Sequence, residues 1–238
     1  MLGPMWLFPL LAAVVAFAFA ISLGRRFLER RRPYQLVWML ALAMFGLATL
    51  AVVAGVIDGW SRFTFDVYWA LGAVLNVPFL AAGEVLLLVR RPWVPWAVAV
   101  VLVFLTAYTL SVLQAAEVAA SALAEQLPSG KEVFGDGSPA HRLPQLISIP
   151  SYVILLVGTV WSAWGMRGRP ELRDRFVGTV LIAVGATVVA GGASFSAAGA
   201  LIGFIATLLV GIALMYGGFL RASRPAVAAP SAQPEPVR

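Results

Sequence analysis

The chain has 238 residues, a composition that is 61% hydrophobic and only 12% charged, and a mean hydropathy of +0.91. Soluble domains carry about 25% charged residues, so this composition excludes a soluble fold and makes the lipid bilayer the expected solvent. The formal net charge of +6 does not indicate a nucleic-acid partner, because the arginines flank apolar runs as determinants of membrane topology do.

The first apolar run ends at an arginine-rich segment, residues 24–34, which holds five arginines against the single acid Glu29. Such clusters stay in the cytoplasm while the flanking apolar runs enter the bilayer. The residues before the first run are uncharged, whereas a secretory signal peptide begins with positive charge. We therefore expect an uncleaved first helix with its N-terminus outside.

The apolar runs predict an all-α membrane protein, a seven-transmembrane-helix bundle with its N-terminus outside and its C-terminus in the cytoplasm. The expected spans of this domain, residues 1–220, are residues 5–23, 35–57, 67–89, 93–116, 145–166, 176–191 and 200–220. This layout places fourteen of the seventeen basic residues on the cytoplasmic side, as expected for a multi-pass protein of the inner cell membrane.

Three connections carry further expectations. Residues 117–144 contain glycines, prolines and charges, which predict an irregular loop outside the membrane. Residues 191–199, GGASFSAAG, are expected to form a tight outer turn between spans six and seven. The Pro- and Ala-rich residues 221–238 are expected to be a disordered cytoplasmic tail.

Three segments, YQLVW at residues 34–38, TVWSAW at 159–164 and ALMYGGFL at 213–220, carry a resemblance. They resemble segments of uncharacterised bacterial seven-helix integral membrane proteins. The resemblance implies a bacterial seven-helix protein, and it implies no activity.

The sequence offers little for enzyme chemistry. There are no cysteines, so thiolate metal sites and thiol nucleophiles are excluded. The only lysine, Lys131, and the only histidine, His141, lie in the expected outer loop, which excludes a retinal Schiff base or axial haem ligands within the spans. We expect no catalytic residue, metal or cofactor.

Glu84 is the acid that the layout places inside the bilayer, six residues before Arg90 or about 9 Å along a helix axis. Intramembrane acids are costly and often functional, so Glu84 is a candidate for ion or proton movement. Because long arginine side chains reach back along a helix, pairing with Arg90 or Arg91 is the favoured interpretation. In the same span, Pro78 should free a carbonyl near residue 74, and Asn76 is expected to hydrogen-bond a neighbouring span.

Spans four and five carry polar side chains at similar depth, in the half of the bilayer that faces outside. These stripes either line an outward-facing cavity or hydrogen-bond to each other. The candidate ligand-binding residues are Asn76, Tyr108, Ser111, Gln114, Glu117, Ser148, Ser151 and Tyr152.

Small residues recur every four positions along span seven, at Gly199, Gly203, Thr207 and Gly211. This spacing lets another helix approach closely. The expected partner face on span six consists of Gly178, Ala186 and Ala190, and a homo-oligomer is the alternative use of the stripe.

The sequence therefore predicts a ligand-binding or sensory membrane protein with an outward-facing pocket for a small molecule between spans three, four and five. The alternatives are a small transporter or channel that uses Glu84 and Asn76, and a structural or assembly protein.

Overall fold

The computed structural model describes residues 5–223, which form an all-α bundle with no strand in that range. Seven of its helical segments are long and apolar enough to cross a membrane, which confirms the expected number of spans. They are Leu7–Arg30, Pro33–Asp58, Arg62–Leu88, Val94–Ala115, Pro139–Met166, Pro170–Ala197 and Leu201–Ala222. The expected tail beyond Ser223 lies outside the described residues.

Four spans are single α-helices, and three are built from several helical pieces. The single helices are α1 (Leu7–Arg30), α2 (Pro33–Asp58), α5 (Val94–Ala115) and α10 (Leu201–Ala222). The third span joins α3 (Arg62–Val67), the π-helix η1 (Tyr68–Leu75) and α4 (Asn76–Leu88). The fifth joins α7 (Pro139–Leu143), the π-helix η3 (Pro144–Ser148) and α8 (Ile149–Met166), and the sixth joins η4 (Pro170–Leu172) and α9 (Arg173–Ala197).

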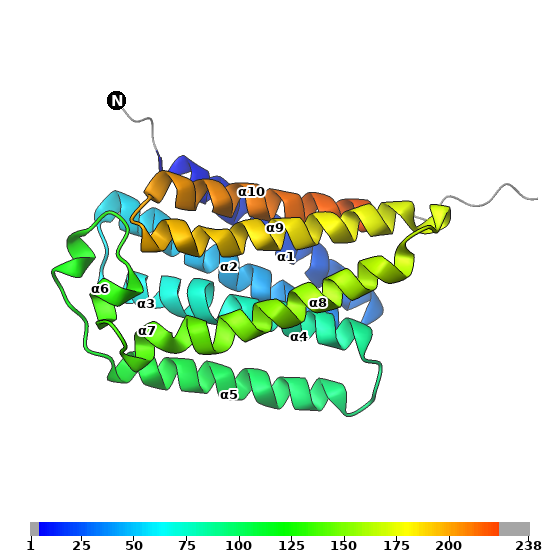
Figure 1. Ribbon diagram of the computed structural model, residues 1–238, viewed down its shortest axis with the longest axis horizontal. Coiled ribbons are helices and arrows are strands. Elements are labelled where there is room, and N and C mark those ends of the chain that lie inside the picture. The colour runs from blue at the N-terminus through cyan, green and yellow to red at the C-terminus, as the bar shows by residue number, and fades with distance from the viewer. Residues whose placement is uncertain (1–4, 224–238) are drawn as a thin grey trace, which may run out of the picture.

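The bundle has two different ends (Figure 1). One end, here the loop-covered end, carries residues 116–138 with the short helices η2 (Ala122–Ala124) and α6 (Gly130–Phe134). The other, here the arginine-rich end, carries the connections α1–α2, α4–α5 and α8–α9, with most of the arginines. Helix α1 begins at the loop-covered end and α10 ends at the arginine-rich end, so the two helices run in the same direction, as an odd number of spans requires.

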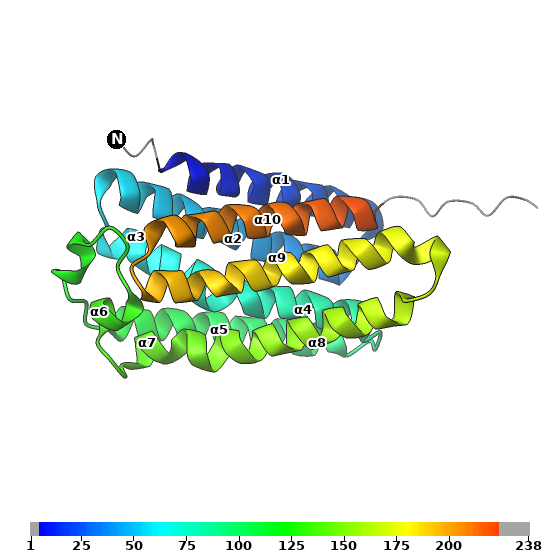
Figure 2. The ribbon, with the colours of Figure 1, turned by 45° about the horizontal axis from the view of Figure 1, so that its top comes forward.

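Six of the seven spans form a closed ring. Helix α1 packs on α2, α2 on α4, α4 on α8, α8 on α9, α9 on α10, and α10 back on α1. Figure 1 shows α5 at the edge of the bundle, where it packs on the third span and on α7; in Figure 2 it lies behind α7 and α8. Its remaining surface is exposed and apolar, which suits contact with lipid. The ring encloses the cavity described in the next subsection.

The contact between α1 and α10 closes the ring and is mostly aromatic. The Phe19 ring lies 4.7 Å from the Phe219 ring and 5.2 Å from the Tyr216 ring. The guanidinium of Arg26 lies 4.5 Å from the centre of the Phe219 ring, within the range of a cation–π interaction. The first and last helices are thus joined through both apolar area and charge.

Helices α9 and α10 meet along glycines. A Cβ at Gly185 would lie 2.6 Å from the carbonyl oxygen of Gly211. About two helical turns away, a Cβ at Gly178 would collide in the same way with the carbonyl oxygen of Gly218. The backbones therefore touch without intervening side chains. Of the three residues expected to form the partner face, Gly178 packs on α10 in this way, whereas Ala186 and Ala190 line a cavity.

The connection between these two helices is shorter than the sequence suggested. Helix α9 continues to Ala197, so most of residues 191–199 is helical rather than a turn. The chain reverses at Gly199, whose φ of 65° explains the glycine. Gly199 has no packing role here, because a Cβ on it would meet nothing within 4 Å.

Candidate functional site

A cavity of about 550 Å³, here the main cavity, lies inside the ring towards the loop-covered end. Small-molecule sites typically have volumes of about 300–1,000 Å³ and mostly apolar walls with a few polar groups. The main cavity fits both criteria: side chains from α2, the third span, α8, α9 and α10 form its apolar walls, and residues 129–132 and His141 also line it. We treat it as the candidate site.

Two distorted helical segments form one wall of the main cavity. The π-helices η1 and η3 pack against each other, and Tyr68, Gly72, Pro144 and Ser148 from them line the space. A π-helix places one extra residue in a turn and shifts the side chains that follow, which is why such segments often occur at functional sites. Neither π-helix was predicted from the sequence.

Pro78 determines a contact in this wall. It has no N–H, so it cannot donate to the carbonyl oxygen of Val74 as an α-helix requires. The hydroxyl of Ser148 supplies a donor instead, 2.9 Å from the Val74 oxygen and 2.7 Å from the Ala73 oxygen. The expected free carbonyl near residue 74 is therefore present, and the fifth span satisfies it.

Three other polar side chains that line the main cavity also bond within the protein. Asn76 donates from Nδ2 to the carbonyl oxygen of Ala41 in α2 at 2.7 Å, which confirms that it joins neighbouring spans. Thr49 donates to its own helix at the Phe45 oxygen. The Tyr68 hydroxyl lies 3.3 Å from Ser196 Oγ on α9. The interhelical bonds connect the second, third and sixth spans around the cavity.

The segment 117–144 is an ordered cover rather than an irregular loop. Trp60 donates from Nε1 to the Gln126 oxygen at 3.1 Å, and Trp69 donates in the same way to the Ala140 oxygen at 3.1 Å. Gly130 of α6 lies directly against the Trp69 ring, where a side chain would collide with it. Aromatic side chains thus hold the cover against the ring of helices.

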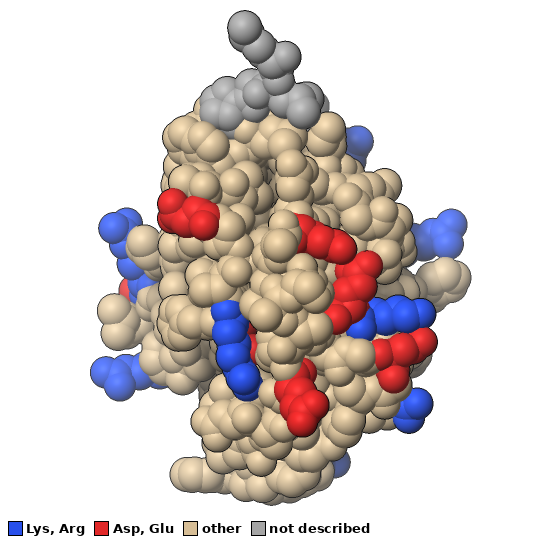
Figure 3. All heavy atoms as spheres, turned by 90° about the vertical axis from the view of Figure 1, so that its left-hand side faces the viewer, with Lys and Arg blue, Asp and Glu red and all other residues tan. Residues whose placement is uncertain are grey.

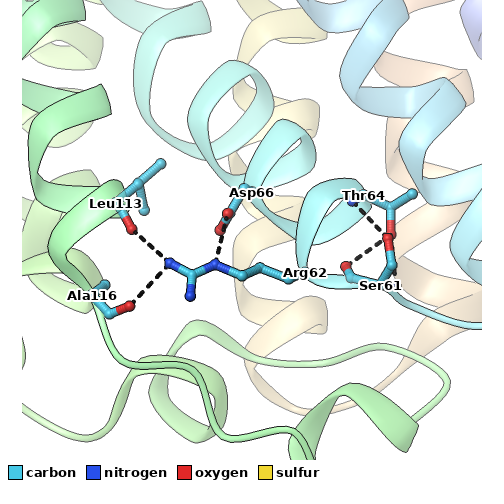
Figure 4. Close-up of polar contacts among 6 residues, drawn as sticks. All are labelled: Ser61, Arg62, Thr64, Asp66, Leu113 and Ala116. Carbon is cyan, nitrogen blue, oxygen red and sulfur yellow. Dashed lines mark hydrogen bonds and ion pairs between the residues drawn. The ribbon is translucent and has the colours of Figure 1, made fainter.

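Arg62 fastens α5 at the same end (Figure 4). Its guanidinium donates to the carbonyl oxygens of Leu113 and Ala116 at 3.3 and 3.1 Å and pairs with Asp66 at 3.5 Å. The last carbonyls of a helix have no partner within the helix, and a cation there also interacts favourably with the helix dipole. Arg62 therefore caps α5 and ties it to the third span.

Residues that line the main cavity reach the surface between the fifth and sixth spans. Helices α8 and α9 meet near the arginine-rich end and diverge towards the loop-covered end in the view of Figure 1. The cavity-lining residues on the two sides of this gap are exposed: Gln145 and Ile149 on one side, Ala190, Ala193 and Ala197 on the other. A molecule dissolved in the bilayer could enter along this line.

A second cavity of about 90 Å³, here the small cavity, adjoins the main cavity towards the arginine-rich end. The two share the lining residues Leu42, Leu80, Tyr152, Leu155, Ala186 and Met215. Tyr152 also bridges α8 and α9, with its hydroxyl 2.8 Å from Thr187 Oγ1. Among the described residues, Glu84 is the only acidic one that lines the small cavity.

The position of Glu84 differs from the favoured interpretation of the sequence. Only 5% of the residue is exposed, and the ion pairs within the described residues all join other groups. Arg90 and Arg91 are exposed beyond the end of α4, while Glu84 turns inward against α8. The end of the helix explains the difference: α4 stops at Leu88 and Val89 is extended, so Arg90 and Arg91 leave the helix and do not follow its spacing back towards Glu84.

The structure divides the predicted ligand-binding residues into two groups. Asn76, Ser148 and Tyr152 line the main cavity, while Ser151 bonds to the Ile147 oxygen of its own helix. The span-four residues lie on α5 and just beyond its end, outside the ring, and line neither cavity: Tyr108, Ser111, Gln114 and Glu117. The pocket thus lies between spans two, three, five, six and seven. The prediction that span four contributes to it was wrong.

Some lining residues were not assigned to the cavity from the sequence, although a signal was present. Thr49 is an isolated polar residue within the apolar α2, and it lines the main cavity. On α9, Ala186, Ala190, Ala193 and Ala197 follow helical spacing and line the cavity along one face. Their small size leaves the space open.

The chain matches no protein-family model, no curated protein and no solved structure.

Proposed function

We propose that this protein is a multi-pass membrane protein that binds a lipophilic small molecule in the main cavity. The observation that carries the proposal is a space of about 550 Å³ inside a ring of six helices, with apolar walls and a sideways opening. Protein interiors are otherwise closely packed, so a space of this size is a candidate binding site.

The chemistry of the walls suggests the kind of ligand. Thr49, Tyr68, Asn76 and Ser148 already bond within the protein, whereas the buried Nδ1 of His141 has no hydrogen-bond partner in the described residues, so the lining suits a ligand with few polar groups. The opening between α8 and α9 faces the region that lipid occupies. An apolar or amphipathic molecule that partitions into the bilayer therefore fits better than a sugar or an amino acid.

We also propose that the loop-covered end faces outward and that the membrane is the inner membrane of a bacterium. The support is the arginine distribution, because twelve of the fifteen basic residues in the described part of the chain lie at the other end of the bundle. Single cysteines introduced at the exposed Glu125 and Glu171 should react with a membrane-impermeant maleimide from opposite sides. Reaction of Glu171→Cys from outside would reverse this orientation.

A photoreactive fatty alcohol tests the binding proposal in nanodiscs. The probe should label peptides of η3, α8 and α9, and an excess of the unlabelled alcohol should compete this labelling away. Ala190→Phe places a ring in the cavity and should reduce the competed labelling at least threefold. The matched control Ala107→Phe, on the exposed face of α5, should leave it unchanged. Labelling that no competitor reduces would contradict the proposal.

Transport is a second candidate function, and the small cavity favours it. This cavity extends the enclosed space from the main cavity towards the arginine-rich end and contains an ionisable group. Uptake of the same alcohol probe into proteoliposomes would distinguish transport from binding alone. Binding without transbilayer movement would leave the receptor-like function.

A further inference from the structure

Glu84 lies in an unusual environment for a carboxyl group. Helix α4 carries it into the small cavity, and its side chain lies against α8 at Gly158, where a Cβ would come within 2.7 Å of Glu84 Cγ. No hydrogen bond or ion pair joins it to another described residue, although only 5% of it is exposed. The glycine thus makes room for a buried acid that has no partner within the described residues.

A buried carboxylate without a partner is expensive. Removing a charge from water costs several kcal/mol even after the protein relaxes, by general estimates, and a nearby opposite charge offsets this cost. Buried ionisable groups of this kind in membrane spans are therefore candidates for binding or transfer of a charged species. A cation bound beside Glu84 would offset the cost of its charged form.

The charges around the two cavities favour a cation as well. Within the described residues, the small cavity has no Lys, Arg or His in its lining, and the phenol of Tyr152 is its only other ionisable group. At the main cavity, the ammonium of Lys131 is already paired with Asp136 at 3.0 Å. The lining of the small cavity therefore offers no positive charge to an anion.

The surface at the loop-covered end also favours cations over anions. Acidic side chains are spread across this face (Figure 3). The segments 58–66 and 117–142 contain six acidic residues against three basic ones. A negative surface raises the local concentration of cations and speeds their approach.

We infer that Glu84 binds the positively charged head of an amphipathic cation, such as a long-chain amine, whose apolar chain lies in the main cavity. The inference rests on the proposed function, since it identifies the class of ligand for the same site. The small cavity, at about 90 Å³, has room for an ammonium group rather than for a whole ligand. The head would pass Tyr152, which lines both cavities, and meet the carboxylate beyond it.

Two photoreactive probes with the same alkyl chain test this inference in nanodiscs. One ends in a hydroxyl and the other in a trimethylammonium group. For the wild-type protein, competed labelling of α8 and α9 should half-saturate at a lower concentration with the ammonium probe than with the alcohol. Glu84→Gln keeps the size of the side chain and removes its charge, so it should raise the half-saturating concentration of the ammonium probe at least tenfold.

The controls separate this inference from the proposed function. Glu117→Gln removes an exposed acid just beyond the end of α5 and should change neither probe's labelling. The alcohol should label Glu84→Gln as it labels the wild type, which also shows that the variant is folded. If the ammonium probe labels Glu84→Gln as strongly as the wild type, the inference is overturned while the proposed function stands. If the alcohol fails to give competed labelling in the wild type, the proposed function itself fails.

Discussion

The hydroxyl of Ser148 in the fifth span donates to the carbonyl oxygen of Val74 in the third, at 2.9 Å. Val74 stands four residues before Pro78, and a proline cannot donate to that oxygen. A sequence feature that weakens one helix is therefore compensated by another helix. Because Val74 and Ser148 belong to the two π-helices that form a wall of the main cavity, this bond also fixes the shape of the candidate site.

Ser148→Ala should lower the free energy of unfolding by about 1 kcal/mol, the usual magnitude for a lost hydrogen bond between helices. In a Pro78→Ala background the loss should be smaller, because the alanine introduced there would restore the backbone donor. Unfolding in mixed micelles, arranged as a double-mutant cycle, measures the difference. Ser151→Ala is the matched control, since its hydroxyl bonds to its own helix. Equal losses in both backgrounds would show that the proline does not create the need for Ser148.

The glycine contact between α9 and α10 gives a second prediction. Gly185→Ala should destabilise the protein by about 1–3 kcal/mol, as overpacking does, because its methyl group would press on a backbone carbonyl that cannot rotate away. Gly191→Ala, on the same helix, should be neutral or stabilising, because nothing lies within 4 Å of the new Cβ. Thermal unfolding of the two purified variants provides the comparison. A melting temperature for Gly185→Ala equal to that of Gly191→Ala would mean that the helices do not touch at this point.

A third prediction concerns pH and the cover of the main cavity. The hydroxyl of Ser129 donates to the Glu132 carboxylate at 2.6 Å, and the Ser129 amide donates to it at 3.3 Å. These two hydrogen bonds hold the pKa of Glu132 below its ordinary value of 4.5. The folded-state pKa is therefore lower than the unfolded one, so the stabilisation is complete above the ordinary value and is lost as pH falls through the lowered pKa.

Hydrogen exchange measures this effect locally. Protection of the amides in residues 129–134, corrected for intrinsic exchange rates, should decrease as the pH falls below 4.5, because the capping box at α6 loses its carboxylate. Glu132→Gln should remove that pH dependence, and Glu117→Gln should retain it. Protection in the wild type that stays constant as the pH falls well below the ordinary pKa of glutamate would contradict the expected role of the cap.

Some of the site could be predicted from the sequence. Seven apolar runs correspond to seven helical spans, because hydropathy and helix length are local properties. The free carbonyl before Pro78 and the interhelical bond of Asn76 were also predictable. Each follows from the chemistry of one residue inside an apolar helix.

The arrangement of the helices could not be predicted in the same way. The polar residues of α5 share a face whether that face meets another helix or the bilayer, and only the tertiary structure places them outside the ring. Likewise, α9 carries both glycines and alanines at helical spacing, and the sequence does not show which set packs on α10. The direction of Glu84 depends on the position of α8, which is distant in the sequence.

The ring of helices has a consequence for the synthesis of the protein. Phe19 and Phe219 are separated by 200 positions, and their contact closes the ring. A ribosome adds about 5–20 residues per second, so α1 waits roughly 10 to 40 seconds for its partner. During that time the cavity walls contributed by α10 are missing, and the space is open to lipid on that side. The main cavity is therefore among the last parts of the protein to form, and a nascent chain that stalls before residue 201 would carry an incomplete one.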